Sequence, residues 1–152
     1  MRFLLDTNVV SEARRQFPNA KVLAKLQAHR DESAIAAPTW HELKYGCDRL
    51  PPSKRKQQLA SYIESLGATM QILPYDERAA TWHARERSRL SKVGLMPAFA
   101  DAQIAAIAAT RGLILVTNNV SDFQYFDAQE RSRIGLTPAS QRRLMQNLVL
   151  SD

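Results

Sequence analysis

The sequence predicts a single α/β domain with a twisted, mostly parallel sheet of four to five strands flanked by helices. Two observations predict this fold class. Short apolar runs of strand length alternate with longer segments in which apolar residues recur every three or four positions. Short strands separated by helices are typical of a parallel sheet, whose strands need crossover connections. A length of 152 residues without a repeat or linker also limits the chain to one domain.

The first predicted strand and helix lie within the first thirty residues. Arg2–Leu5 forms a short apolar run, and a continuous run of this length is typical of a strand buried on both faces. Asn19–Arg30 places Val22, Leu23 and Leu26 on one face, which predicts an amphipathic helix.

A second strand and two helices are predicted in the next segment. Ser33–Ala37 is a short apolar run that Pro38 closes. Thr39–Leu50 and Ser53–Leu66 each repeat apolar residues every three or four positions, which predicts two helices. Gly67 favours a helix end and therefore predicts where the second of these helices stops.

A third strand and a long helix follow. Met70–Leu73 is short and apolar, which favours a strand. Asp76 is a favourable N-cap for a helix that runs to about Val93, and Gly94 is expected to end that helix.

The last elements include the clearest strand of the sequence. A helix is predicted over Asp101–Arg111 with Gly112 at its end, and Leu113–Val116 predicts the fourth strand. Ile134–Thr137 is a candidate fifth strand, and Gln141–Leu150 has the spacing of an extra amphipathic helix. We therefore expect a domain at residues 1–140 and a helical C-terminal extension of unassigned role at residues 141–152.

The composition predicts a soluble, cytoplasmic and basic protein. No apolar stretch approaches the ~18 residues of a membrane span, so no membrane partner is expected, and the N-terminus lacks a signal-peptide pattern. Cys47 is the only cysteine, which excludes an internal disulfide and fits a reducing compartment. The 21 Lys and Arg residues outnumber the 15 Asp and Glu residues, and the net charge of +6 favours a polyanionic partner.

Acidic and polar residues follow the predicted strands or start the helices after them. Asp6 comes directly after the first strand, Glu42 lies in the first turn of the helix after the second strand, and Asp101 starts a later helix. Asn119 and Asp122 follow the fourth strand. Because the carboxyl ends of parallel strands meet at one edge of a sheet, we expect these groups to converge there.

Each acid also has an ordinary structural explanation that the sequence leaves open. Glu42 can close a capping box with Thr39, and Asp101 suits a helix N-terminus electrostatically. Asp6 can form an Asx turn, and Asp122 can cap a short helix. Several carboxylates at one edge, however, repel one another unless a cation neutralises them. Mg²⁺ or Mn²⁺ prefers such oxygen ligands, whereas one cysteine and three scattered histidines do not make a zinc site.

Three segments stand out in this order, with the predicted helices between them: LLDTNVVSE (residues 4–12), TWHELKYG (39–46) and ADAQIAAIAATRGLILVTNNVSDF (100–123). Together they resemble the PIN-domain ribonuclease toxins of the VapC/FitB type. The resemblance covers roughly residues 1–126. It implies a PIN-like domain with an acidic pocket that binds Mg²⁺ or Mn²⁺, and endonucleolytic cleavage of RNA that inhibits translation.

The resemblance also implies roles for individual residues. Asp6, Glu42 and Asp101 match the acids of the family, whereas Asn119 stands where the family often has an acid, with Asp122 three residues later. The implied catalytic acids are Asp6, Glu42, Asp101 and Asp122, and the implied metal ligands are Asp6, Asp101, Glu42 and Asn119. The side chains that we expect to orient these acids and their waters are Thr7, Asn8 and Thr117.

The expected partners are an RNA substrate, a cognate antitoxin that occludes the site, and a second copy in a homodimer, with larger toxin–antitoxin assemblies built from these. The candidate contacts to the RNA backbone are Arg14, Arg15, Lys44, Arg85, Arg87 and Arg89. An alternative is a catalytically degenerate PIN domain that binds RNA or a protein without cleavage, which Asn119 leaves open. A haloacid-dehalogenase-like phosphatase is disfavoured, because Asn8 stands where that chemistry needs a general acid.

Overall fold

The computed structural model describes residues 1–15 and 17–126, and its four described strands form one sheet. The strands are β1 (Phe3–Leu5), β2 (Ser33–Ala36), β3 (Gln71–Leu73) and β4 (Ile114–Val116). Their order is β3-β2-β1-β4, and every neighbouring pair is parallel. This confirms the predicted α/β domain with a parallel sheet. The candidate fifth strand, the C-terminal helix and the boundary at residue 140 lie outside the described residues.

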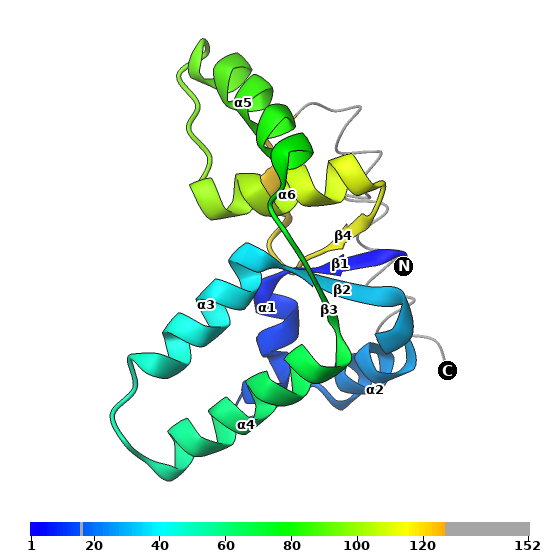
Figure 1. The fold of residues 1–152 in the computed structure, drawn as a ribbon, viewed down its shortest axis with the longest axis vertical. Coiled ribbons are helices and arrows are strands. Elements are labelled where there is room, and N and C mark those ends of the chain that lie inside the picture. The colour runs from blue at the N-terminus through cyan, green and yellow to red at the C-terminus, as the bar shows by residue number, and fades with distance from the viewer. Residues whose placement is uncertain (16, 127–152) are drawn as a thin grey trace.

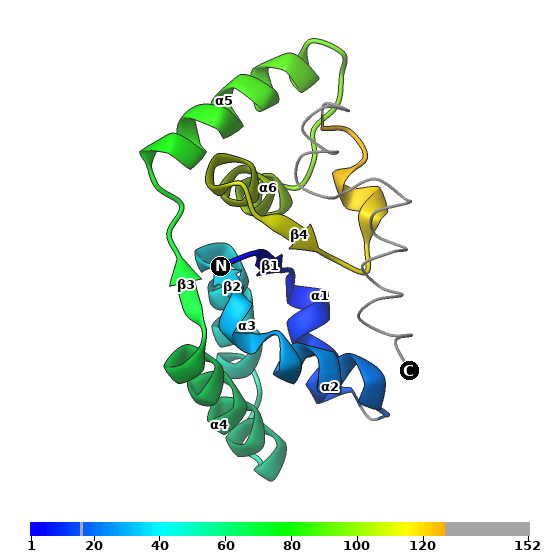
Figure 2. The ribbon, with the colours of Figure 1, turned by 90° about the vertical axis from the view of Figure 1, so that its right-hand side faces the viewer.

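Helices cover both faces of the sheet. The α-helices are α1 (Thr7–Val10), α2 (Ala20–Ala28), α3 (Ala37–Asp48), α4 (Lys54–Thr69), α5 (Glu77–Ser91) and α6 (Phe99–Arg111). The short 3₁₀ helices are η1 (Ser11–Arg14), η2 (Arg30–Glu32) and η3 (Val120–Phe123). Figures 1 and 2 show α5 and α6 on one side of the sheet and α2 and α4 on the other, with β3 leading from one side to the other. Among the described helices, none combines the length and hydropathy that a membrane span needs.

The strands divide the hydrophobic core into two layers. Leu4 and Leu115 pack in the layer that contains α5 and α6, whereas Leu5 and Val116 pack in the layer with α1, α3 and α4. Successive side chains of a strand point to opposite faces, so a strand covered on both faces needs a continuous apolar run. This explains why the strands could be found in the sequence as apolar runs rather than alternating patterns.

The register of the sheet brings distant segments of the chain to one edge. Leu5 of β1 pairs with Ile35 of β2 on one side and with Val116 of β4 on the other. The residues that follow Leu5 and Val116 are Asp6 and Thr117, so both leave the sheet at the same place. We call this side of the sheet the carboxyl edge.

Gly67 does not end its helix, which corrects the prediction from the sequence. The helix α4 continues to Thr69, and the extended residue Met70 caps it. A Cβ atom at Gly67 would lie 2.7 Å from Cη2 of Trp40 on α3. The glycine therefore permits α3 and α4 to approach closely. By contrast, Gly112 has a φ of +64° and ends α6 as predicted.

Candidate functional site

Asp6 lies at the carboxyl edge between β1 and α1. Its backbone N–H donates to the carbonyl oxygen of Val116 at 3.0 Å, which continues the pairing of β1 with β4. Its side chain caps α1, because Oδ1 accepts a hydrogen bond from Thr7 N at 2.8 Å. The helix-cap role that the sequence left open is therefore present, and it leaves the second oxygen, Oδ2, for other partners.

Two polar side chains donate hydrogen bonds to Oδ2 of Asp6. Thr117 Oγ1 donates at 2.8 Å, and Asn8 Nδ2 donates at 2.9 Å. Asn8 Nδ2 also lies 3.2 Å from Thr117 Oγ1, so the three side chains form one cluster. Asp6 is 6% exposed and Thr117 is 1% exposed. Asn8 and Thr117 are therefore placed to orient the carboxylate of Asp6.

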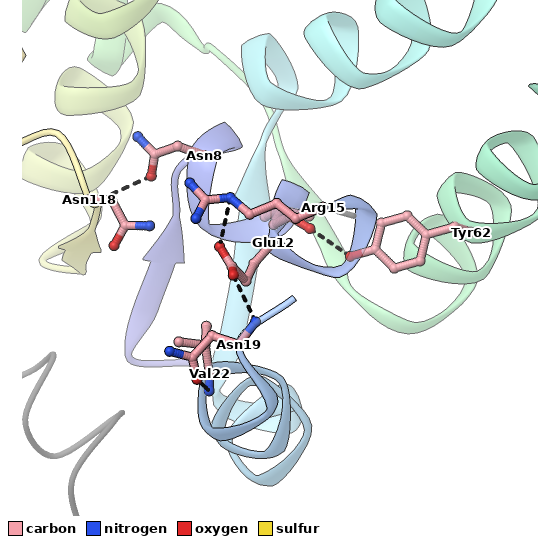
Figure 3. Close-up of polar contacts among 8 residues, drawn as sticks. Asn8, Glu12, Arg15, Asn19, Val22, Tyr62 and Asn118 are labelled. Atoms are coloured by element: carbon pink, nitrogen blue, oxygen red, sulfur yellow. Dashed lines mark hydrogen bonds and ion pairs between the residues drawn. The ribbon is translucent and has the colours of Figure 1, made fainter. Parts of the chain in front are cut away.

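The loop after β4 is tied to the same cluster. Asn118 N donates to Asn8 Oδ1 at 3.0 Å (Figure 3), and Asn119 N donates to Thr117 Oγ1 at 3.0 Å. The side chain of Asn119 donates from Nδ2 to the carboxylate of Asp122 in η3. The contact of Asn118 was not found from the sequence, because it is made by a backbone N–H, which every residue except proline carries.

Glu42 lies in the second turn of α3 and not in the first turn, because the helix begins at Ala37. The N-cap residue is Ala36, so Thr39 and Glu42 do not form the capping box that the sequence allowed. The carboxylate of Glu42 instead accepts a hydrogen bond from the hydroxyl of Thr7. This bond links α3 to α1 at the carboxyl edge.

Asp101 lies in the first turn of α6, within electrostatic reach of the other acids. Burial, followed by the negative charges of Asp6, Asp122 and Glu42, raises the pKa of Asp101 from 3.8 to about 6. Burial also raises the pKa of Asp6, and the charges of Glu42 and Asp122 add to this, while its hydrogen bonds oppose it. The four acids predicted from the sequence are therefore close enough to repel one another.

We call Asp6, Glu42, Asp101 and Asp122 the acidic edge. Across residues 1–15 and 17–126, the ion pairs of Arg and His side chains involve other carboxylates, so no side-chain cation neutralises the acidic edge. In the same part of the chain, no three Asp, Glu, His or Cys side chains stand in a ready arrangement of metal ligands. The possible metal ligands at the acidic edge are nevertheless all carboxylate oxygens, whose negative charges repel one another. Such a set of ligands fits a hard divalent ion.

Comparison with known proteins gives the family of the chain. Residues 3–128 match the PIN domain family. The tRNA(fMet)-specific endonuclease VapC of Shigella flexneri is 32% identical over 124 residues, which cover 82% of this chain and 91% of that protein. Toxin FitB of Neisseria gonorrhoeae is 36% identical over 124 residues, which cover 79% of this chain and 89% of that protein.

The fold agrees with the sequence match. The crystal structure of FitAcB from Neisseria gonorrhoeae superposes with a TM-score of 0.73 and 35% identity, over 81% of this chain and 91% of that chain. The family match covers β1 to η3, and therefore every segment that brings an acid to the carboxyl edge. The chain is a member of the PIN-domain family and belongs with the toxins of the VapC/FitB type.

Proposed function

We propose that this chain is a metal-dependent endoribonuclease, the toxin of a toxin–antitoxin pair, which cleaves RNA and thereby inhibits translation. The observation that carries the proposal is the convergence of Asp6, Glu42 and Asp122 on Asp101, whose pKa their charges help to raise to about 6. Relatives that match most of the chain are named as an endonuclease and a toxin.

Asp6 and Asp101 are the proposed principal ligands of Mg²⁺ or Mn²⁺, with Glu42 and Asn119 completing the set and Asp122 as a further catalytic acid. When bound, the divalent ion supplies Lewis-acid activation of water and neutralises charge on the reacting phosphate. Without a bound ion the pKa of Asp101 is about 6, so below that pH a proton competes with the ion for this carboxylate.

The neighbouring side chains keep the acids in position. Thr117 and Asn8 hold Oδ2 of Asp6, and the hydroxyl of Thr7 holds Glu42. Such hydrogen bonds reduce the reorganisation that the carboxylates undergo when substrate and ion bind. In-line attack of water on the phosphodiester leaves a 5′-phosphate and a 3′-hydroxyl.

The proposed partners follow from the relatives and the fold. They are an RNA substrate, a cognate antitoxin that occludes the acidic edge, and a second copy in a homodimer that enters larger toxin–antitoxin assemblies. A cytoplasmic location belongs to the same proposal, since an inhibitor of translation acts where translation occurs. The free, buried thiol of Cys47 fits a reducing compartment.

The test is RNA cleavage by purified variants in the presence of Mn²⁺. Asp6→Asn and Asp101→Asn are each expected to abolish cleavage while the circular dichroism spectrum of the folded chain persists, because each removes a negative ligand. Asp48→Asn is the matched control, since Asp48 is an exposed acid at the end of α3 and away from the acidic edge. Cleavage by Asp6→Asn at the wild-type rate, with contaminating nuclease excluded, would contradict the proposal.

The alternative is a degenerate PIN domain that binds RNA or a protein partner without cleavage. The observation that favours it is Asn119, which stands where the family often has an acid. The same assay separates the two functions, because the degenerate domain would bind RNA and leave it intact at every Mn²⁺ concentration. Sequencing the RNA ends produced after brief induction in cells would then identify the class of RNA that is cut.

A further inference from the structure

A pocket of about 300 Å³ opens between η1 and α4. Its lining includes three arginines, Arg14, Arg15 and Arg55, together with Ala13, Gln58, Leu59 and Tyr62. The first two arginines come from the end of η1, and Arg55 comes from the first turn of α4. No acidic side chain lines this pocket, which we call the arginine pocket.

Only one of the three arginines has a carboxylate partner among the described residues. Arg15 Nε lies 3.2 Å from Oε2 of Glu12 (Figure 3). In the described part of the chain, neither Arg14 nor Arg55 lies within 4.0 Å of a carboxylate oxygen. Arg14 and Arg55 are both exposed, and both line the arginine pocket without a carboxylate partner among the described residues. An anion between them removes their mutual repulsion and adds two attractive interactions.

The walls of the arginine pocket are held in place by partly buried hydrogen bonds. Glu12 is 3% exposed, and besides Arg15 its carboxylate binds the backbone N–H of Asn19 at 2.9 Å. The hydroxyl of Tyr62 on α4 donates to the carbonyl oxygen of Val10 at 2.7 Å, which ties α4 to the start of η1. The backbone that carries the arginines is thus fixed before any ligand binds, which lowers the entropic cost of binding.

A second arginine-lined pocket shows that arginines alone do not make such a site. Arg78 and Arg85 line a pocket of about 490 Å³ between α5 and α6, and Glu77 lines it with them. Arg78 Nη2 also donates to the carbonyl oxygen of Thr110 at 3.3 Å. This pocket already contains a negative charge, and one of its arginines already has an acceptor. It therefore lacks the unbalanced positive charge of the arginine pocket.

The arginine pocket follows the acidic edge closely along the chain. The helices α1 and η1 join Asp6 to Arg14 without a break, and at the usual rise per residue they span at most about 14 Å. When one phosphodiester of a single RNA strand lies at the acidic edge, other phosphates of the same strand can reach the arginine pocket. The acidic edge itself repels the RNA backbone, so binding requires positive charge on a neighbouring surface.

We infer that the arginine pocket binds a phosphate group of the RNA strand whose scissile bond lies at the acidic edge. Arg14 and Arg55 supply the two charges, and the amide of Gln58 supplies a neutral hydrogen-bond donor. This inference rests on the proposed function for its choice of ligand. The net charge of +6 and the absence of acids from the lining favour RNA over a protein partner as the source of the anion.

The test measures RNA affinity against salt concentration, in EDTA so that metal-dependent cleavage does not interfere. A fluorescein-labelled oligouridylate is titrated with the full chain, and the slope of log Kobs against log [KCl] is determined by fluorescence anisotropy. Each phosphate contact to a single strand contributes about 0.7 to that slope. Arg14→Gln and Arg55→Gln should therefore each reduce the slope by about 0.7, and the double variant by about 1.4.

The matched control is Arg78→Gln, because Arg78 occupies the same position in α5 that Arg55 occupies in α4, the second residue of the helix. It should leave the slope unchanged. Arg14→Lys and Arg55→Lys should keep the wild-type slope, since they keep the charge. Unchanged slopes in both glutamine variants, or no oligouridylate binding by the unsubstituted chain at low salt, would overturn the inference. Weakened antitoxin binding with unchanged RNA slopes would overturn it in favour of a protein partner.

The outcome is separable from that of the proposed function. If the unsubstituted chain cleaves RNA with Mn²⁺ but the glutamine variants keep the wild-type salt slope, the phosphate site is rejected and the nuclease function stands. If the variants have smaller slopes but the unsubstituted chain never cleaves RNA, the nuclease function is rejected and the phosphate site stands. The melting temperature of each variant is measured as well. If it equals that of the unsubstituted chain, a change in slope reports RNA binding and not a loss of folded protein.

Discussion

Thr117 is the residue on which the arrangement of the acidic edge most depends. Its hydroxyl donates to Asp6 and accepts from Asn8 and from the backbone N–H of Asn119, while its side chain is 1% exposed. One buried oxygen thus connects β1, α1 and the loop after β4. The donated bond also lowers the pKa of Asp6 against the raising effect of burial.

Thr117→Val is expected to shift the pH dependence of RNA cleavage to higher pH. The valine has the same shape but no donor for Asp6, so the pKa of Asp6 rises and proton competition with the metal ion extends to higher pH. Loss of such a supporting contact lowers metal affinity or activity by about 10- to 100-fold. Cleavage rates from acidic to mildly alkaline pH give the profile. Thr117→Ser keeps the hydroxyl and should keep the wild-type profile, and identical profiles for Val and Ser would refute this role.

The residue types of the acidic edge could be found from the sequence, but their contacts could not. The sequence predicts that Glu42 lies near the carboxyl edge, but it does not identify its partner there, Thr7, which is 35 positions away in the chain. Hydrogen bonds of this kind depend on the rotamers and on the relative placement of two helices. Neither is a property of the local sequence.

At the scale of elements, the packing of α3 on α4 depends on one glycine. Gly67 faces the ring of Trp40, and a Cβ atom there would meet that ring at 2.7 Å. The sequence suggested a helix end at this position, because glycine is common past helix ends. The alternative reason for a glycine, close approach of a neighbouring side chain, becomes visible only when the two helices are packed together.

Gly67→Ala is expected to destabilise the chain by about 1 kcal/mol, because the cost of displacing Trp40 exceeds the gain in helix propensity. Gly46→Ala on α3 is the matched control. A Cβ atom at Gly46 meets nothing within 4 Å, so this substitution should stabilise the chain by up to about 1 kcal/mol. Urea unfolding of both variants gives the comparison. Equal stabilisation by the two alanines would show that Trp40 adapts without cost.

The short helices α1 and η1 are not predicted from the sequence. The four-residue helices α1 and η1 are too short for apolar residues to repeat on one face. They form because Asp6 caps the first turn and because Val9 and Val10 are buried against the sheet. These two helices nevertheless determine where Arg14 and Arg15 lie.

At the scale of the whole molecule, the acidic edge opposes folding at neutral pH in the absence of metal. The pKa of Asp101 is about 6 in the folded chain and near 3.8 in the unfolded chain, so the folded state binds the proton more tightly. Its contribution to stability is therefore complete below about pH 4 and is lost as the pH rises to about 6. Because Asp101 is partly exposed to solvent, screening reduces this loss to the order of 1 kcal/mol.

Mn²⁺ should raise the melting temperature at pH 7 and have little effect below about pH 4, because the ion and the proton compete for the same carboxylates. Asp101→Asn should show a smaller loss of metal-free stability between pH 4 and pH 7 than the unsubstituted chain. It should also lose the response to Mn²⁺. Differential scanning fluorimetry of both chains at several pH values measures these differences. If Mn²⁺ raised the melting temperature of the Asp101→Asn chain by the same amount, the ion would bind at another site.

The order of strands and helices, the candidate acids and the family follow from the sequence by itself. Apolar runs, helix periodicity and turn residues are local properties, and the acids stand immediately after the runs that become strands. Only the tertiary structure decided which side chains meet. Thr117 reaches Asp6 across 111 positions because Leu5 pairs with Val116, and Arg55 reaches the end of η1 because Tyr62 ties α4 to Val10. Strand register and helix packing minimise the free energy of the whole chain, so they cannot be derived from any one segment.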